Sequence, residues 1–227
     1  MSYTVYRAIR HDLTQTLIRV DLEDPSTLDL YRRYLPEQVH AVYSDPPWNP
    51  GNATYWRTHA KDGRIASYDR FLDGWCAVAA LCQERGARNV LVEQSANVAH
   101  QDLLRAAIQR CPGWRLLFER RVYTVQYGSG ARLLPNALLH FGVSALDTDP
   151  TGMHGEPMTL RAVRGLSYLP VGGVIVDPCT GKGMTSRTAH AFGLHFVGSE
   201  LNPERLGVTL KWLRGQGYDV AEVEAGP

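Results

Sequence analysis

The residues Asp45, Pro46, Pro47 and Trp48 place hydrogen-bond acceptors beside an aromatic plate. Each proline removes a backbone N–H donor and stiffens the turn, so the carbonyl groups remain as acceptors. The indole of Trp48 can stack on a planar ring. This combination suits a flat heterocycle that carries an NH₂ group. The alternative is a structural turn with Asp45 as a cap and Trp48 in the core. We favour the functional interpretation because a buried strand is predicted directly before Asp45.

A second group of candidate residues follows another apolar strand, nearer the end of the chain. Asp177 ends that strand, and the glycines after it allow a tight turn and the close approach of a ligand. The helix predicted next has an N-terminus that favours negative charge. Glu200 lies about 20 residues further on, at the tip of the next strand, where an acid can accept hydrogen bonds from ribose hydroxyl groups. This half is therefore predicted to bind a cofactor that contains adenosine.

Two related phosphate-binding motifs are excluded by single residues. Val176 stands where a P-loop has its first glycine, and Gly183 follows Lys182 where a P-loop has Ser or Thr. The dinucleotide fingerprint needs glycine at position 186, which is serine. The four cysteines form no C-x-x-C pair and are predicted to be free thiols, and no metal site is predicted.

Aromatic and basic residues are interleaved in the segment after Trp48, residues 49–64, which we predict to be a loop. It contains Tyr55, Trp56, Arg57 and Lys61, a mixture that suits nucleic-acid contact through stacking and phosphate pairing. An ordinary surface loop is the alternative.

A second tract, residues 101–135, holds six arginines against two acids and therefore has a net charge of +4. Arg120 and Arg121 lie in it as candidates for phosphate contact. A solvated face is the alternative interpretation of this charge.

The elements that must position these residues alternate along the chain between short apolar strands and helices. Strands are expected at 39–44, 89–93, 114–118, 122–127, 137–143, 173–176 and 195–198. Helices are expected at 68–86, 103–111, 159–169, 185–192 and 204–214. Continuous apolar strands are typical of a parallel sheet covered on both faces. We predict an α/β fold with a mostly parallel sheet, helices on both faces and an antiparallel edge strand.

The length of 227 residues allows one large domain. Apolar residues make up 44% of the chain and charged residues 21%, which excludes a disordered or collagen-like protein. No apolar run reaches the ~20 residues that a membrane helix needs, and residues 1–7 have no apolar signal core. We expect a cytoplasmic protein of a bacterium or a phage-infected cell, without a membrane partner.

The turn at Asp45 resembles the catalytic motif of the amino-methyltransferases, which methylate exocyclic amines of bases. Residues 177–183 resemble their S-adenosylmethionine loop, 197–203 their ribose-binding strand, and 154–161 the segment that leads into the cofactor half. The catalytic motif precedes the cofactor loop, as in the permuted β-class of this family. The resemblance covers about residues 35–213 and implies a Rossmann-like methyltransferase fold.

The resemblance also implies the cofactor, the partner and the reaction. It implies S-adenosylmethionine, held by Asp177, Pro178, Cys179, Gly181, Gly183, Glu200, Asn202 and Pro157. It implies DNA as the partner and methyl transfer to N6 of adenine, with Asp45 and the Pro46 carbonyl accepting the two N–H bonds of the amine. Cytosine N4 in DNA, adenine N6 in RNA, and a catalytically silent subunit are the alternatives.

Three departures from the family are visible. Cys179 stands where relatives commonly have Phe, and Asn136 where they often have Glu. Many relatives insert a target-recognition domain between the halves, whereas this chain has only the linker 146–152 there. We therefore expect one methyltransferase domain, 1–227, with a catalytic half at 1–146 and a cofactor half at 153–227. A second copy of the chain, in a homodimer, is the alternative source of a reading surface.

Overall fold

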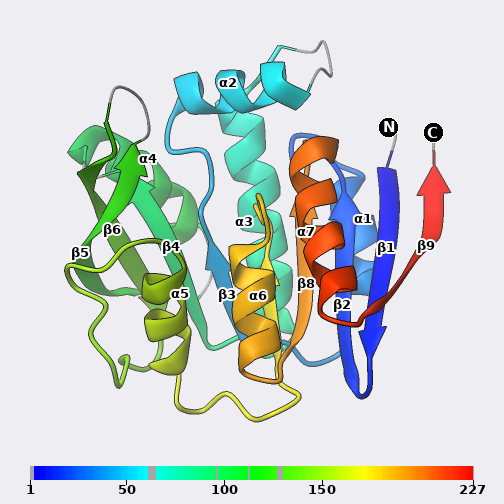
Figure 1. Ribbon diagram of the computed structural model, residues 1–227. Helices are drawn as coiled ribbons and strands as arrows, with labels where there is room; N and C mark the ends of the chain where they lie inside the picture. Colours follow the sequence, from blue (N-terminus) through cyan, green and yellow to red (C-terminus); the bar gives the residue numbers. More distant parts are fainter. Residues whose placement is uncertain (1–2, 61–64, 96, 112, 127–129, 227) are drawn as a thin grey trace.

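One sheet runs through the whole computed structural model, which describes residues 3–60, 65–95, 97–111, 113–126 and 130–226 (Figure 1). Its nine strands lie in the order β5-β6-β4-β3-β7-β8-β2-β1-β9. The strands are β1 (Tyr3–Arg10), β2 (Leu13–Arg19), β3 (Ala41–Ser44), β4 (Asn89–Ser95), β5 (Leu116–Gln126), β6 (Arg132–Gly142), β7 (Val174–Asp177), β8 (His195–Glu200) and β9 (Asp219–Gly226).

The centre of the sheet is parallel and both of its edges are antiparallel. β4, β3, β7, β8 and β2 pair in parallel, while β6 and β5 on one side and β1 and β9 on the other pair antiparallel. The predicted α/β class and the parallel core are confirmed. The antiparallel part is larger than the single edge strand we expected, because the β5–β6 hairpin forms one edge and β9 pairs with the β1–β2 hairpin at the other.

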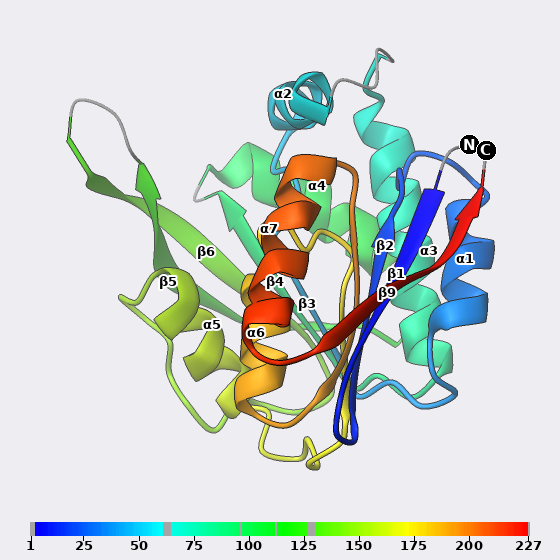
Figure 2. The ribbon, with the colours of Figure 1, turned by 45° about the vertical axis from the view of Figure 1, so that its right-hand side comes forward.

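Helices cover both faces of this sheet (Figure 2). They are α1 (Thr27–Tyr34), α2 (Pro50–Ala60), α3 (Tyr68–Glu84), α4 (Val98–Gln109), α5 (Gly155–Arg164), α6 (Met184–Ala191) and α7 (Pro203–Gly215). α1, α3 and α4 share one apolar cluster, and α5, α6 and α7 share the other. α2 belongs to neither layer; it lies across the upper edge of the sheet in Figure 1.

α3 shows how the sequence produces this packing. Ser67 caps the helix by accepting a hydrogen bond from the backbone N–H of Arg70 at 3.4 Å. Apolar side chains recur at helical spacing along its buried face, among them Phe71, Trp75 and Cys82. Trp75 is fully buried, and its indole N–H donates to the Ser44 hydroxyl at 3.1 Å. The helix is therefore attached to the strand that ends at the predicted catalytic turn.

The segment after Trp48 is a helix, not the loop we predicted. Asn49 accepts a hydrogen bond from the backbone N–H of Asn52 at 2.9 Å, and Pro50 occupies the first helical position of α2. An Asn followed by Pro is a helix-start signal. The apolar residues of α2 have weak helical periodicity, because the helix lies across the ends of the strands and not on a face of the sheet. The sequence pattern therefore did not reveal it.

Other elements also differ from the sequence-based expectation. One strand, β5 (Leu116–Gln126), covers most of the ranges 114–118 and 122–127, where two strands were predicted. Residue 127 lies outside the described residues. The chain before residue 39 forms β1, β2 and α1, and the chain after residue 217 forms β9, none of which was predicted. The residues of β9 are mostly exposed, so it lacks the apolar signal of a buried strand. Within the described residues, no helix is both long enough and apolar enough to cross a membrane.

Candidate active site

A cleft of about 270 Å³ opens at the carboxyl ends of four parallel strands. Most of its lining comes from the turns after β2, β3, β7 and β8 and from α2, and α3, β5 and α7 contribute one residue each. The lining residues include Asp21, Glu23, Asp45, Pro46, Pro47, Trp48, Trp56, Arg57, Thr124, Pro178, Cys179, Glu200 and Arg205. β3 and β7 are adjacent in the sheet although far apart in sequence, so the two predicted sites meet in one cleft.

The turn after β3 presents its acceptors to this cleft. The Trp48 indole N–H donates to Oδ1 of Asp45 at 3.0 Å, which fixes the carboxylate. The Tyr68 hydroxyl donates to the Pro47 carbonyl at 3.1 Å and so uses that acceptor within the protein. Among the described residues, none donates to the carbonyl of Pro46. Oδ2 of Asp45 and the carbonyl of Pro46 are therefore the acceptors that this turn offers to a ligand.

The environment of Asp45 favours the protonated, neutral carboxyl group more than bulk water would. Desolvation raises the pKa of Asp45, although its side chain keeps an exposed surface towards the cleft. The hydrogen bond from Trp48 and the positive charge of Arg205 oppose this rise. A carboxylate with a raised pKa is a better proton acceptor than an ordinary aspartate.

Asp177 lies beneath the loop after β7 and does not line the cleft. It is 3% exposed, accepts from the Thr185 hydroxyl at 2.6 Å, and accepts from the Cys179 backbone N–H at 2.9 Å. Burial raises the pKa of Asp177 to about 7, and the two hydrogen bonds oppose this rise. Its role in the structure is to shape the loop, whose next residues, Pro178 and Cys179, do line the cleft.

The two loop glycines serve helix packing where we expected ligand approach. Both have left-handed backbones, with φ of +57° at Gly181 and +83° at Gly183. A Cβ at Gly181 would lie 2.6 Å from the Arg205 guanidinium, and one at Gly183 would lie 2.5 Å from the Thr209 hydroxyl. Neither glycine lines the cleft, so their absent side chains let α7 pack against the loop.

Glu200, at the end of β8, carries the acceptor of the cofactor half. It is mostly buried, and its Oε1 accepts from the Asn202 backbone N–H at 2.8 Å. Burial raises the pKa of Glu200, while Arg205 and the backbone N–H groups of Asn202, Gly181 and Leu201 oppose the rise. The Asn202 side chain caps α7, accepting from the backbone of Glu204 at 2.9 Å, and does not line the cleft.

Pro157 is exposed on α5 and lies outside the cleft lining. Of the eight predicted cofactor residues, the structure thus brings three to the cleft, Pro178, Cys179 and Glu200. The expectation for Pro157 rested on a resemblance of segments, which carries no information on side-chain direction.

The predicted nucleic-acid residues of α2 divide between its two faces. Tyr55 and Trp56 are 51% and 37% exposed, and their rings lie in edge contact at 4.9 Å. Arg57 is only 4% exposed, and its guanidinium bonds Asp21 and Glu23. Helical geometry turns Arg57 inward while its neighbour Trp56 stays outside, so its guanidinium is occupied within the protein, and contact of Arg57 with nucleic acid stays a prediction without support from this geometry. Lys61 lies outside the described residues.

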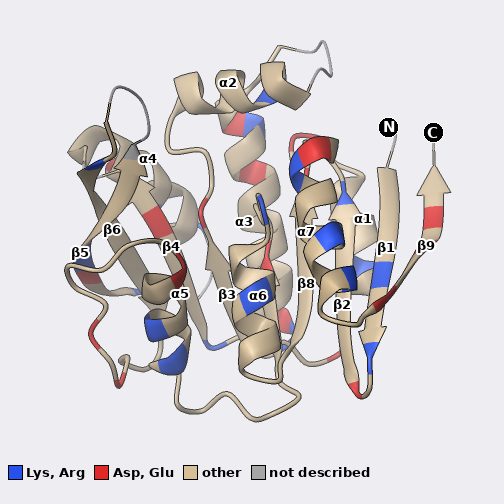
Figure 3. Ribbon diagram, in the orientation of Figure 1, with Lys and Arg blue, Asp and Glu red and all other residues tan. Residues whose placement is uncertain are grey.

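The basic tract at 101–135 is largely compensated by nearby acids. Arg105 pairs with Asp102 and Glu119, Arg110 with Asp73, and Arg120 with Asp149. Arg121 is exposed at the edge of β5. Figure 3 shows Lys and Arg scattered over several elements in the part of the chain it colours, without one continuous basic band. Exposed pairs of this kind are worth about 0–1 kcal/mol and can exchange for phosphate.

Glu93 and Arg205 are two candidate residues that sequence reasoning missed. Glu93 lies on β4 and is 5% exposed. It follows Val92, which pairs with Ser44 at the end of β3, and its carboxylate accepts a hydrogen bond from the Tyr43 hydroxyl at 2.6 Å. Burial raises the pKa of Glu93, and the charges of Asp45 and Asp177 raise it further. An acid ending an apolar strand was the available signal.

Arg205 contributes a positive charge to the same cleft. Its guanidinium lies over the Trp56 ring, 4.1 Å from the ring centroid, and its Nε lies 3.9 Å from Oε2 of Glu200. It thus joins α7 and β8 to α2. No pattern in the sequence indicates this contact, because Trp56 and Arg205 are far apart along the chain.

No protein-family model matches the sequence, and no curated protein sequence is detectably similar to it. Solved structures are similar in fold. M1.HpyAVI in complex with S-adenosylmethionine has a TM-score of 0.61 and 11% identity, covering 88% of this chain and 99% of that one. TTHA0409 of Thermus thermophilus, complexed with S-adenosyl-L-methionine, has a TM-score of 0.56 and 16% identity, covering 83% and 90%.

The PvuII DNA methyltransferase, which is cytosine-N4-specific, is similar as well. It has a TM-score of 0.57 and 11% identity, over 86% of this chain and 84% of that one. At these identities the likeness concerns the fold. The chain therefore has the α/β fold of these structures, which agrees with the Rossmann-like fold predicted from the sequence.

Proposed function

We propose that this protein is an S-adenosylmethionine-dependent DNA methyltransferase that methylates an exocyclic amine, N6 of adenine in the first instance. One observation carries the proposal: the acceptors of Asp45 and Pro46 share a single cleft with Glu200 and the loop after β7. This arrangement places the acceptors for an amine-bearing base beside the acceptor for an adenosine-containing cofactor. The similar structures crystallised with S-adenosylmethionine support the choice of cofactor.

The residues of the cleft fit this cofactor by charge and by shape. Four carboxyl groups line the cleft, those of Asp21, Glu23, Asp45 and Glu200, against the guanidinium groups of Arg57 and Arg205. This excess of acids suits a ligand that carries a sulfonium. Glu200 would accept hydrogen bonds from the ribose hydroxyl groups, and Pro178 and Cys179 would pack beside it. When bound, S-adenosylmethionine supplies an electrophilic methyl group.

Asp45 and Pro46 would prepare the amine for reaction. The lone pair of an exocyclic amine is delocalised into the ring, which makes the nitrogen a poor nucleophile. Oδ2 of Asp45 and the Pro46 carbonyl would accept its two N–H bonds and favour a pyramidal nitrogen. After transfer, the nitrogen carries an extra proton, which Asp45 can accept because its pKa is raised. The indole of Trp48 keeps Oδ1 of Asp45 in place.

The permuted order of strands supports the β-class assignment within this proposal. The catalytic strand β3 precedes the cofactor strand β7 in the chain. The similarity to a cytosine-N4 enzyme keeps cytosine as the second target. Adenine in RNA and a silent subunit stay predictions that the experiment below examines, and a homodimer stays a prediction.

Methyl transfer to nucleic acid tests the proposal directly. The protein is incubated with isotope-labelled S-adenosylmethionine and duplex DNA, single-stranded DNA or RNA, and the nucleosides are identified by mass spectrometry. We expect labelled N6-methyladenine in DNA. Labelled N4-methylcytosine or methylated RNA would select the corresponding alternative. Cofactor binding without transfer to any polynucleotide would identify a silent subunit and overturn the proposed activity.

A further inference from the structure

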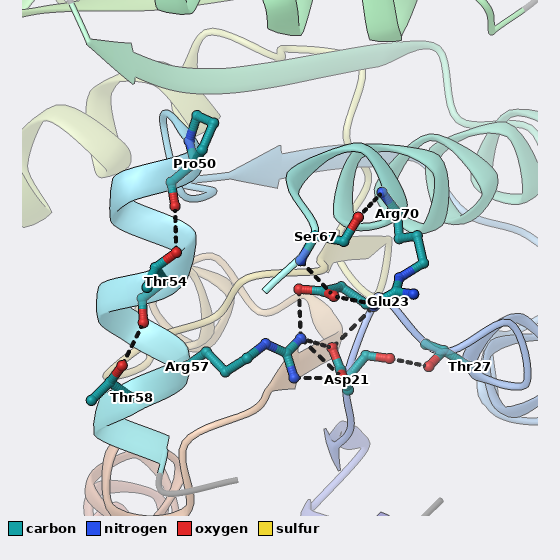
Figure 4. Close-up of polar contacts among 9 residues, drawn as sticks. All are labelled: Asp21, Glu23, Thr27, Pro50, Thr54, Arg57, Thr58, Ser67 and Arg70. Atoms are coloured by element: carbon teal, nitrogen blue, oxygen red, sulfur yellow. Dashed lines mark hydrogen bonds and ion pairs between the residues drawn. The ribbon is translucent and has the colours of Figure 1, made fainter. Parts of the chain in front are cut away.

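Two acidic residues that follow β2 form buried ion pairs with one arginine of α2. Asp21 is 4% exposed, and its carboxylate accepts from both terminal nitrogens of Arg57, at 3.0 Å and 2.9 Å. The second terminal nitrogen, Nη2, also lies 2.6 Å from Oε1 of Glu23. All three side chains are at most 6% exposed. We call Asp21, Glu23 and Arg57 the Arg57 cluster; Figure 4 shows its contacts.

The Arg57 cluster connects four segments of the chain. Glu23 also accepts from the backbone N–H of Ser67, at 2.9 Å, which is the N-cap residue of α3. Thr27, in the first turn of α1, donates its hydroxyl to the Asp21 carbonyl at 2.5 Å. Arg57 is the only member on α2, so α2 is attached to the other segments through this one guanidinium in the cluster.

The same helix forms a wall of the cleft. Asn52, Ala53, Trp56 and Arg57, all on α2, line the cleft that contains Glu200. On the other side of the cleft, Trp56 receives the guanidinium of Arg205. α2 is therefore held at two points over the ends of β2 and β8, and Trp56 lies at the cleft.

Burial makes the ion pairs of Arg57 important for the attachment of α2. A buried carboxylate that loses its cation is strongly unfavourable, so removal of one partner of a buried pair costs far more than removal of one partner of an exposed pair. Arg57 serves two buried carboxylates at once, and a planar guanidinium can do so with parallel hydrogen bonds. Lysine keeps the charge but lacks this geometry. Glu23 keeps a second cation, Arg70, at 3.6 Å, whereas the two hydrogen bonds to Asp21 come from Arg57. Arg57 is thus the buried attachment of α2, beside the more exposed contact between Trp56 and Arg205.

We propose that Arg57 is a positioning residue that holds α2 over the cleft and thereby retains the bound cofactor. The retention part rests on the proposed function, because it names S-adenosylmethionine as the ligand. The attachment of α2 itself does not depend on that function. Arg57 lines the cleft, but its guanidinium is occupied by Asp21 and Glu23. We therefore expect it to act through the position of α2, so its loss should change cofactor release more than the chemical step.

The test uses Arg57→Met, Arg57→Lys and a matched control, Arg32→Met, in the full chain. Arg32 also pairs with an aspartate, Asp29, but that pair is exposed on α1 and is not part of the cleft lining. Hydrogen exchange of the amides of α2 is measured without cofactor. The Kd and dissociation rate of S-adenosylmethionine are measured by calorimetry and tryptophan fluorescence, and kcat is measured at saturating cofactor.

For Arg57→Met we expect exchange in α2 and cofactor dissociation to rise by roughly 10-fold, a typical coupling, with kcat changed by no more than a few-fold. Arg57→Lys should lie between this variant and the wild type, and Arg32→Met should match the wild type. If Arg57→Met does not fold, the Arg57→Lys result decides.

Unchanged α2 exchange in a folded Arg57 variant would overturn the attachment. Faster exchange with an unchanged dissociation rate would overturn the retention role. If the wild-type protein binds no S-adenosylmethionine, the proposed function fails, while the exchange measurement still decides whether Arg57 holds α2.

Discussion

At the scale of single residues, Asp45 and Glu200 line the same cleft yet differ in what surrounds them. Asp45 has one oxygen engaged by the Trp48 indole and an exposed face towards the cleft. Glu200 is held by backbone N–H groups at the end of its strand. Under the proposed function the first residue acts on the target amine and the second on the cofactor. Substitution of each should therefore affect a different measured quantity.

Asp45→Ala should lower kcat by at least ~100-fold while the Kd of S-adenosylmethionine stays within a few-fold, because the lost acceptor faces the amine alone. Methyl transfer and calorimetric binding are measured on the same preparation. Asp29→Ala, an exposed acid on α1, is the control. A variant that still methylates DNA at a rate close to that of the wild type would rule out a catalytic role for Asp45.

Glu200→Ala should weaken S-adenosylmethionine binding by roughly 10- to 100-fold, because a hydrogen bond to a charged group contributes about 1.5–3 kcal/mol. Calorimetry gives the Kd, and Glu37→Ala, on an exposed loop, is the control. A thermal unfolding curve separates this loss from misfolding of the turn that Glu200 shares with Asn202. An unchanged Kd in the folded variant would refute the ribose assignment.

At the scale of elements, the backbone of α3 packs directly against the backbone of the segment after β2 at Gly74. A Cβ at Gly74 would lie 1.8 Å from the Leu22 carbonyl oxygen. This carbonyl belongs to the residue between Asp21 and Glu23, so the close approach brings α3 against the segment that binds Arg57. Glycine is required there because of the neighbouring backbone, and not because of a special φ angle.

Gly74→Ala should lower the free energy of unfolding by about 2–4 kcal/mol, since a buried backbone must move to admit the methyl group. Gly207, on α7, is the matched control, because a Cβ added there would meet no described atom within 4 Å outside its own helix backbone. Gly207→Ala should leave stability unchanged or raise it by about 0.5–1 kcal/mol, through helix propensity. Urea unfolding measures both. Equal stability of the two variants would contradict the close approach.

At the scale of the whole molecule, the carboxyl ends of the parallel strands bring acids together. Asp45 follows β3, Asp177 and Glu200 end β7 and β8, and Glu93 lies two residues before the end of β4. Burial raises the pKa of each. Topology alone produces this cluster, because adjacent parallel strands end at one edge of the sheet. Stability should therefore depend on pH in a direction opposite to that of most salt-bridged proteins.

The free energy of unfolding should fall as the pH rises from about 4 to about 7, where Asp177 titrates in the folded state. In that range the folded protein binds more protons than the unfolded chain, so stability declines by at most ~1.4 kcal/mol per pH unit for this group. Asp177→Asn keeps the side-chain size and removes the charge, so its unfolding curve should show a smaller slope. Urea unfolding at several pH values measures this, and a slope equal to that of the wild type would contradict the assignment.

Much of the fold and of the candidate site was determined by the sequence alone. The apolar runs at β3, β4, β7 and β8 identified the parallel core, because a strand buried on both faces needs an unbroken run of apolar residues. The acids at the ends of those strands identified the end of the sheet at which the cleft opens, and Asp45 and Glu200 both line it. The strands β1, β2 and β9 and the helices α1 and α2 were not predicted. For β9 and α2 the reason is that β9 is mostly exposed and α2 has weak apolar periodicity, so the local pattern does not reveal them.

Only the tertiary structure decided which side chains face the cleft. Arg57 and Trp56 are neighbours in sequence, yet one is buried on Asp21 and the other lies under Arg205 at the cleft mouth. Likewise, Asp177 and the loop glycines shape the cleft from beneath without lining it. The physical reason is that residue type and spacing specify what a side chain can do. Its partners depend on which distant elements the sheet brings beside it.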